Sequence, residues 1–373
     1  MNRTAAKQVG SIVAFGVIPV VSVVFMFYVA GNSNSLAVDF RNEIYPEAKL
    51  ILEGTNPFPG PTITLIHKAN YIWPPFVGYV VAPLTLLPAT AADYTAAILS
   101  LIAFVAALWI VGVRDWRVYG AAFLWPSVLG EVRTAHLTLV LCLLLAVLWR
   151  TRERFPLAGL VLGVALALKF FLWPLVVWLA ALRRWRDTAL AACFASVTLL
   201  LVLPFISLPE YARLLRRLGQ TFDQDSYTPF GLLSQLGASD RVAQAVAIVL
   251  GVGVLVIAWR LQSFVLFVAA ALMLSPIVWL DYYAVLAVPL AIVRPRLSPI
   301  WLLPLLTIGM RSAGFGIGHV ETSLRTLSVF AVVTIVVARA ERSAERTPPR
   351  ADRSGRLWGF VSRPQARPET QRT

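Results

Sequence analysis

The chain has 373 residues, of which 58% are hydrophobic and 14% are charged, and its formal net charge is +14. Soluble domains are about half apolar and about one quarter charged, so this composition excludes an ordinary soluble domain and indicates an integral membrane protein. Arginines at helix ends and in the C-terminal tail account for the positive charge, because basic residues set topology and contact anionic lipids. Membrane lipids are therefore expected partners, and nucleic acid is not.

The first apolar run, residues 12–30, is long enough to cross a bilayer and lacks the small-residue pattern of a cleaved signal. Arg3 and Lys7 precede it, so the positive-inside rule predicts a cytoplasmic N-terminus. Residues 31–72 then form a first extracytoplasmic loop. Within this loop, residues 45–54 have the pattern of a short amphipathic helix that ends at a glycine.

Prolines interrupt the next apolar stretch, residues 73–88, at Pro74, Pro75, Pro83 and Pro88. Because proline breaks the hydrogen-bond ladder of a helix, a straight membrane span is not expected here. By the positive-inside rule the stretch begins and ends outside. We expect a re-entrant or juxtamembrane element.

Arginine clusters mark the ends of the helices that follow and are expected to face the cytoplasm. Helices are expected at residues 91–113, 118–130 and 135–149. Residues 155–182 begin and end among arginines, so they are expected to form a hairpin of two short helices with Lys169 near its outer turn. The clusters are Arg114/Arg117, Arg150/Arg152/Arg154, Arg183/Arg184/Arg186 and Arg294/Arg296.

The second half of the chain contains a second large outer loop, residues 207–240, reached through a helix at 188–206. Residues 211–218 oppose leucines to arginines, which predicts a helix lying on the membrane surface. Residues 339–373, rich in arginine and proline, are expected to be a disordered basic cytoplasmic tail. The remaining helices are expected at 241–259, 262–275, 282–293, 298–310 and 324–338.

The fold class that follows is an all-α polytopic membrane protein, with about 11–12 transmembrane helices in residues 1–338 and two larger extracytoplasmic loops. Polar residues at a membrane boundary are costly unless they are used, so the outer face is where function is expected. Asp39, Arg41 and Glu43 follow the first span there. The three histidines are scattered singly, so no protein-bound metal is expected.

Short motifs stand at these polar helix ends. In the first loop, Asp39-Phe40 follows the first span, the amphipathic helix closes before Pro57-Phe58, and Tyr71-Ile-Trp-Pro-Pro-Phe comes next. Further along are Ala167-Leu-Lys before a proline, Leu182-Arg-Arg-Trp-Arg, and Ser275-Pro-Ile-Val-Trp. Over residues 35–293 this set resembles glycosyltransferase family 87, which are GT-C-type membrane enzymes related to the mycobacterial polyprenyl-phosphate-mannose-dependent mannosyltransferases.

The resemblance implies a GT-C-like helix bundle in the cell (plasma) membrane. It implies inverting transfer of a sugar, with mannose expected, from a polyprenyl-phosphate donor to a hydroxyl of a glycolipid or polysaccharide acceptor on the extracytoplasmic face. No cofactor is implied, and the sequence gives no support for a divalent cation. The N- and C-termini are expected in the cytoplasm.

Roles for individual residues follow from the resemblance and from the demands of the reaction. Asp39 is expected to be the general base, since a hydroxyl nucleophile must lose its proton. The cations Lys169, Arg41 and Arg213 are candidates for the donor phosphate, whose charge grows as the glycosidic bond breaks. The candidates for binding sugar and acceptor are Glu43, Tyr71, Trp73, His136, Trp279, Asp281 and Tyr282.

Two positions depart from the family's pattern. Ala135-His136-Leu137-Thr138 stands where a Gly-Gln-x-Asn turn is expected, and Asp281-Tyr282 stands where a histidine pair is expected. These changes leave the expected fold in place and bear on the identity of the sugar and the acceptor.

Simpler interpretations stand beside these roles. Asp39 can pair with Arg41, Lys169 can extend to the membrane surface, and the tryptophans can form an aromatic belt. For the whole chain, the alternatives are a transporter or flippase of lipid-linked sugars and a non-catalytic relative. The sequence shows no internal repeat, and its ionisable residues gather at helix ends and in outer loops, which favours the enzyme over the transporter.

Overall fold

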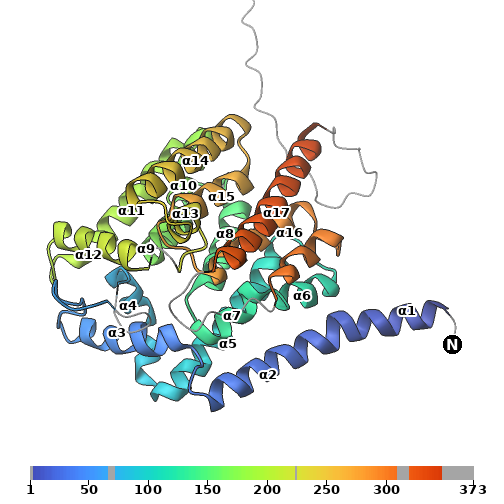
Figure 1. Cartoon of the computed structure of the whole chain (residues 1–373), viewed down its shortest axis with the longest axis horizontal. Helices are drawn as coiled ribbons and strands as arrows, with labels where there is room; N and C mark the ends of the chain where they lie inside the picture. The colour runs from blue at the N-terminus through green and yellow to red at the C-terminus, as the bar shows by residue number, and fades with distance from the viewer. Residues whose placement is uncertain (1–2, 66–71, 223–224, 309–318, 347–373) are drawn as a thin grey trace, which may run out of the picture.

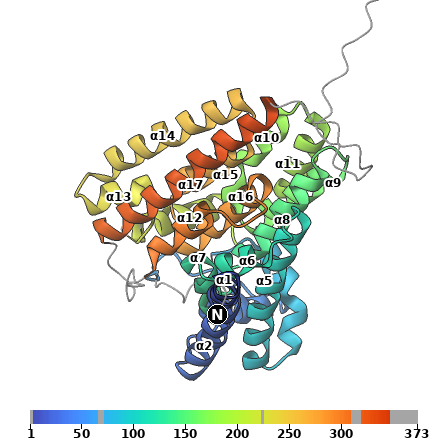
Figure 2. The ribbon, with the colours of Figure 1, turned by 90° about the vertical axis from the view of Figure 1, so that its right-hand side faces the viewer.

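The structure is a computed structural model that describes residues 3–65, 72–222, 225–308 and 319–346. Within these ranges all regular structure is helical, and five helices are long and apolar enough to cross a membrane. Six shorter apolar helical segments of 10–17 residues stand beside them. The prediction of an all-α polytopic membrane protein is confirmed. Figures 1 and 2 show one helix bundle with the N-terminal helix along its edge.

The N-terminal helix is continuous through α1 (Arg3–Ile12), a π-helical turn η1 (Val13–Val17) and α2 (Ile18–Asn32). Most of its apolar side chains are exposed, as for Phe25 at 60%, which suits contact with lipid rather than with protein. It touches the bundle closely at Gly120, where a Cβ atom would overlap the Phe15 carbonyl oxygen. A side chain at that position would push the first helix away.

The first loop contains a π-helical turn η2 (Phe40–Ile44) and α3 (Tyr45–Leu52), which confirms the predicted amphipathic helix. The proline-containing stretch forms α4 (Pro75–Val81) and a 3₁₀ turn η3 (Ala82–Leu86), which together are shorter than any of the five helices long enough to cross a membrane. Proline is well placed in the first turn of α4, because the first backbone N–H groups of a helix have no partner within it.

The next helices are α5 (Ala89–Ile110), α6 (Trp116–Phe123), α7 (Pro126–Thr134) and α8 (Thr138–Thr151). The expectation of a single helix at 118–130 is wrong. The chain leaves the helical conformation at Trp125 and Pro126 begins a new helix, because proline has no N–H with which to continue the old one. α8 packs against α5, α9 and η6, which places it at the centre of the bundle.

Residues 157–181 form the expected hairpin, with α9 (Leu157–Leu168), a 3₁₀ turn η4 (Phe170–Leu172) and α10 (Pro174–Ala181). α11 (Trp185–Leu199) then runs parallel to α9 and is followed by the turn η5 (Leu200–Val202). The parallel direction is set by two contacts, Gly159 against Asp187 and Gly163 against Phe194. α10 connects the end of α9 to the start of α11, so the chain runs back along it. Both ends of the hairpin therefore lie on one side of the bundle, and Lys169, at the turn, lies on the opposite side.

The C-terminal half begins with α12 (Leu208–Thr221), which confirms the amphipathic helix expected at 211–218 and starts at a capping box of Ser207 and Glu210. The elements after it are α13 (Pro229–Gln235), α14 (Asp240–Leu261), α15 (Phe264–Leu274), the 3₁₀ segment η6 (Leu280–Leu286), α16 (Ala287–Val293), the 3₁₀ segment η7 (Pro299–Thr307) and α17 (Val320–Arg346).

α17 extends into the segment expected to be a disordered tail, because residues 339–346 continue the helix. Glu341 explains part of this extension. It accepts hydrogen bonds from the Ser263 hydroxyl and, at 3.4 Å, from the Val265 backbone N–H, so it caps the start of α15. The rest of the expected tail, residues 347–373, lies outside the described residues.

Candidate active site

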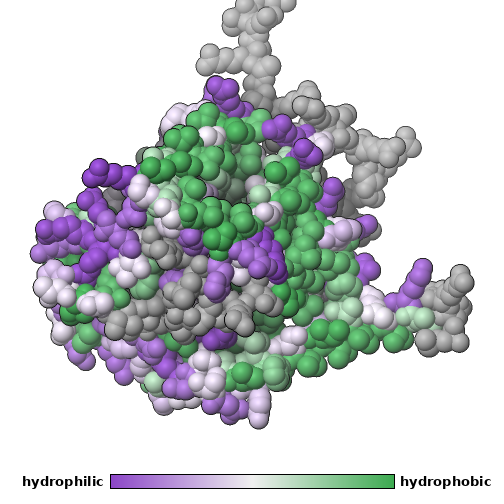
Figure 3. Space-filling view, in the orientation of Figure 1, coloured by the Kyte–Doolittle hydropathy of each residue, from purple (hydrophilic) through white to green (hydrophobic). Residues whose placement is uncertain are grey.

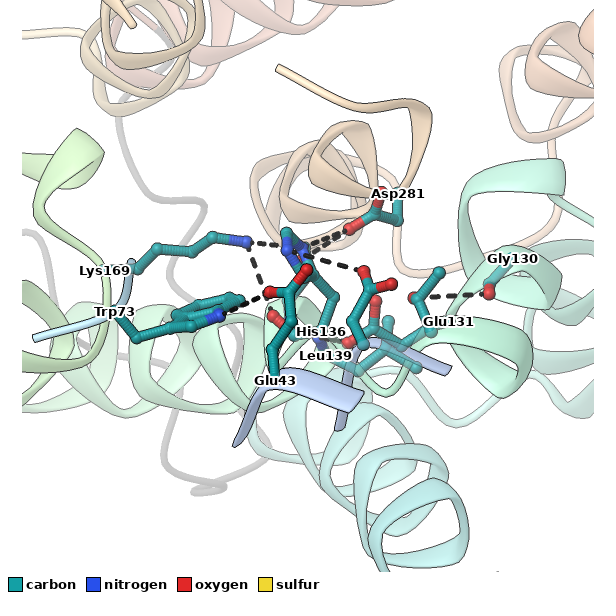
Figure 4. Close-up of polar contacts among 11 residues, drawn as sticks. Glu43, Trp73, Gly130, Glu131, His136, Leu139, Lys169 and Asp281 are labelled. Atoms are coloured by element: carbon teal, nitrogen blue, oxygen red, sulfur yellow. Dashed lines mark hydrogen bonds and ion pairs between the residues drawn. The ribbon is translucent and has the colours of Figure 1, made fainter. Parts of the chain in front are cut away.

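A cavity of ≈ 170 Å³ lies where the first loop, the turn before α8, the hairpin turn, α12 and η6 meet. Four acidic or basic side chains from distant parts of the sequence line it, together with aromatic and apolar side chains. Figure 4 shows several of these side chains pointing toward one another. The acidic and basic ones are Asp39, Glu43, His136 and Lys169.

Asp39 stands directly before η2 and is 4% exposed. The segment that carries it is anchored to α7, because the Ala37 backbone N–H donates to the Val132 carbonyl at 3.3 Å. One carboxylate oxygen, Oδ2, lies 3.7 Å from His136 Nε2. The residue predicted to be the general base is therefore buried beside an imidazole.

His136 is held in an unusual turn between α7 and α8. Its neighbours Ala135 (φ 47°) and Leu137 (φ 65°) both have left-handed backbone conformations, which non-glycine residues adopt rarely. The buried Glu131 stabilises this turn, because its Oε1 accepts from the backbone N–H groups of Thr138 (2.7 Å) and Leu139 (3.4 Å) at the start of α8. A carboxylate at a helix N-terminus is electrostatically favourable.

Asp281 approaches His136 from η6, at the ring nitrogen opposite the one that faces Asp39. Its Oδ2 lies 3.1 Å from His136 Nδ1 and accepts a hydrogen bond of 3.0 Å from the Thr138 hydroxyl. Thr138 thus links Glu131 to Asp281, because its backbone N–H donates to Glu131 and its hydroxyl donates to Asp281. The buried imidazole lies between two carboxylates.

Lys169 reaches the same imidazole from the hairpin turn, where its own backbone is extended and interrupts the helix. Its Nζ lies 2.8 Å from His136 Nδ1 and 3.5 Å from the centre of the Tyr282 ring. The residue is 7% exposed, so it does not extend to the membrane surface as an unconstrained lysine would. Aromatic faces and nearby carboxylates compensate its burial.

Trp73 and Glu43 complete the wall nearest the first loop. The Trp73 indole N–H donates to Glu43 Oε2 at 3.1 Å, and its ring packs edge-on against His136 at 4.6 Å between ring centroids. Trp279 and Tyr282 also line the cavity. Tyr71, likewise predicted to bind sugar or acceptor, lies outside the described residues.

Two predicted phosphate ligands are not among the residues that line this cavity. Arg41 donates from Nε to Asp93 Oδ2 at 2.6 Å and also contacts Asn34, and Asp93 is 1% exposed. Arg213 lies exposed on α12, which presents Tyr211 and Leu215 to the cavity instead. The positions of Arg41 and Arg213 therefore give no support to a role at the phosphate.

Sequence reasoning missed Glu131, Thr138 and Asp93. Glu131 caps the start of α8 from seven residues before Thr138, a spacing outside the local capping patterns, so the sequence gives no signal for it. Nothing in the sequence pairs Asp93 with Arg41, which is 52 residues away. Among the described residues, no group of three or more His, Cys, Asp or Glu side chains is arranged to hold a metal ion.

Comparisons with known proteins agree with the motifs. The family model of glycosyltransferase family 87 matches residues 71–280, which is more than half of the chain and includes His136, Lys169 and Trp279. No curated protein and no solved structure matches the chain. The chain therefore belongs to glycosyltransferase family 87 and is a membrane glycosyltransferase.

Proposed function

We propose that this glycosyltransferase is a GT-C-type enzyme that transfers a sugar, with mannose expected, from a polyprenyl-phosphate donor to a hydroxyl of a glycolipid or polysaccharide acceptor. Transfer proceeds with inversion on the extracytoplasmic face of the plasma membrane. One observation carries the proposal: a buried carboxylate, Asp39, and a buried ammonium group, Lys169, line the same cavity on either side of His136.

Inverting transfer needs a base on one side of the reacting sugar and stabilisation of the leaving group on the other. Asp39 accepts the proton of the acceptor hydroxyl as the new glycosidic bond forms. Lys169 neutralises the charge that grows on the leaving phosphate, and a fixed cation in a buried site stabilises that charge more in the transition state than in the ground state. Glu43, Trp73, Trp279 and Tyr282 surround the space left for the sugar.

A second cavity supports a lipid-linked substrate. It has a volume of ≈ 610 Å³, lies between α12, α13, α14 and α15, and shares Leu215 with the first cavity. Much of its lining is apolar, including Phe230, Ile248 and Leu274. Figure 3 shows hydrophobic side chains over α14 and hydrophilic ones gathered over α12. A chain held in this groove would bring its phosphate toward Lys169.

The arrangement of charge supports an extracytoplasmic site. α8 begins beside the cavity at Thr138 and carries Arg150 in its last turn, while α9 begins after Arg154 and ends directly before Lys169. The arginine clusters of these helices therefore lie at the ends opposite the cavity. By the positive-inside rule those ends face the cytoplasm.

The proposal is tested with purified protein in nanodiscs, polyprenyl-phosphate [¹⁴C]mannose and glycolipid acceptors. Asp39→Asn is expected to lower transfer by about 10²-fold or more, because it removes the base and keeps the shape of the side chain. The matched control is Glu53→Gln, an exposed carboxylate outside the cavity, which is expected to transfer normally. Near-normal transfer by Asp39→Asn at unchanged expression would remove the base assignment.

A further inference from the structure

Two side chains of opposite charge compete for one nitrogen of His136. Lys169 Nζ lies 2.8 Å from Nδ1, and Asp281 Oδ2 lies 3.1 Å from the same atom. An ammonium group can only donate a hydrogen bond and a carboxylate can only accept one. Since a neutral imidazole carries one N–H and one lone pair, Nδ1 serves one of these partners at a time.

The choice at Nδ1 decides what the other nitrogen offers to Asp39. When Lys169 donates to Nδ1, the proton of the ring is on Nε2 and points toward the Asp39 carboxylate, 3.7 Å away. When Asp281 accepts from Nδ1–H, Nε2 carries a lone pair and can take up a proton. Only the second tautomer lets His136 receive a proton that passes through Asp39.

The two competitors differ in how firmly they are held. Asp281 is fixed by the Thr138 hydroxyl at 3.0 Å, and Thr138 is fixed in turn by Glu131. Lys169 extends a flexible four-carbon stem from the hairpin turn and packs over the rings of Tyr282 (3.5 Å) and Trp73 (4.9 Å). Lys169 is therefore the partner that moves, and Asp281 is the one that stays in place.

We infer that donor binding switches the tautomer of His136 and so couples the phosphate subsite to the base. This rests on the proposed function, in which Lys169 binds the donor phosphate. The phosphate draws the ammonium group away from Nδ1. The ring then loses a proton from Nε2 and gains one at Nδ1 by exchange with solvent, remains neutral, and donates to Asp281.

The coupling has a consequence for the transfer step. As the bond between the acceptor oxygen and the sugar forms and the bond to phosphate breaks, the acceptor proton moves to Asp39 and from Asp39 to Nε2. The resulting imidazolium lies between two carboxylates, with the Lys169 charge already neutralised by phosphate. Without the donor, the positive charge of Lys169 opposes protonation of His136. Asp39 is then less able to remove the proton of the acceptor hydroxyl. Asp281 acts through His136 and is a positioning residue.

The tautomer can be read directly by ¹⁵N NMR of His136 in nanodiscs. The chain has three histidines, so His67→Asn with His319→Asn leaves His136 as the only one. In the donor-free protein we expect a pyridine-type signal from Nδ1 and a pyrrole-type signal from Nε2. Lys169→Met is expected to exchange the two signals, whereas Lys169→Arg, which keeps the cation, is expected to leave them unchanged.

Adding farnesyl phosphate is expected to exchange the Nδ1 and Nε2 signals in the same way in the protein with Lys169 intact. Farnesol, which lacks the phosphate, is expected to leave them unchanged. Identical signals with and without the Lys169→Met substitution, or a doubly protonated ring in both proteins, would overturn the inference. Farnesyl phosphate also enters the lipid of a nanodisc, so its ³¹P signal is compared with the signal in nanodiscs without protein. If the protein broadens that signal further but His136 does not respond, the switch is wrong and the phosphate site of the proposed function stands. If the protein causes no further broadening, both fail.

Discussion

The two segments predicted to lie outside the membrane contribute to the cavity in different ways. The first loop supplies charge, through Asp39 and Glu43, from backbone that is anchored to α7. α12 supplies Tyr211 and Leu215, while Arg213 is exposed and lines neither cavity. A charge-rich helix beside a site is therefore not the source of the site's charge.

The largest expected difference between the segments concerns stability. Arg41→Met leaves the buried Asp93 without its ion-pair partner, and removing one member of a buried pair costs about 3–5 kcal/mol. Arg213→Met on the exposed side of α12 is expected to change the free energy of unfolding by about 0.5 kcal/mol or less. Thermal unfolding in detergent compares the two, and equal melting temperatures would break the distinction.

The next largest effect concerns Lys169, the cation of the cavity, which comes from the hairpin turn and not from α12. Lys169→Ala is expected to lower kcat/KM for the polyprenyl-phosphate donor by about 10²-fold, since a fixed cation at the leaving group is lost, and Lys169→Arg is expected to retain part of the activity. Arg213→Ala, which removes an exposed charge on α12 that lines neither cavity, serves as the control and is expected to remain near wild type. A larger loss in the Arg213 variant would reverse the roles of the two segments.

Two substitutions that each remove one hydrogen bond sharpen the comparison. Trp73→Phe removes the indole hydrogen bond to Glu43, and Tyr211→Phe removes the hydroxyl bond to the Ile72 carbonyl at 3.1 Å. Hydrogen bonds to charged groups contribute about 1.5–3 kcal/mol and neutral ones about 1 kcal/mol. We expect a loss of about tenfold in kcat/KM for the first and a smaller one, about fivefold or less, for the second. Initial rates at varied donor concentration measure both.

The smallest effect is a pH dependence of stability at α3. Burial raises the pKa of the Glu47 carboxyl from 4.5 to about 7. The folded protein therefore binds more protons than the unfolded chain between these values, and its stability falls as pH rises through that window. Glu47→Gln cannot lose a proton, so its advantage in melting temperature over wild type should be larger at pH 8 than at pH 5. A constant difference would contradict the shift.

Much of the helical framework follows from local patterns. Apolar runs, prolines and arginine clusters predict the first span, the hairpin around Lys169 and the amphipathic α12, because each depends on residues close in sequence. The interior of the site does not follow in this way. His136 and Asp281 are 145 residues apart and meet only through the packing of η6 against α7 and α8. The same holds for Arg41 and Asp93, which are 52 residues apart and form a pair outside the set of residues that line the cavity.

The length of the first arm of the hairpin bears on how deep the proposed reaction would take place. α9 has 12 residues, which at about 1.5 Å per residue gives a length of roughly 18 Å against a hydrocarbon thickness of about 30 Å. If the arginine end of α9 is at the inner boundary, as proposed, Lys169 is expected well beneath the outer headgroups. A sugar acceptor would then have to descend below the lipid surface to reach Asp39, and we expect the enzyme to select acceptors narrow enough to enter the cavity.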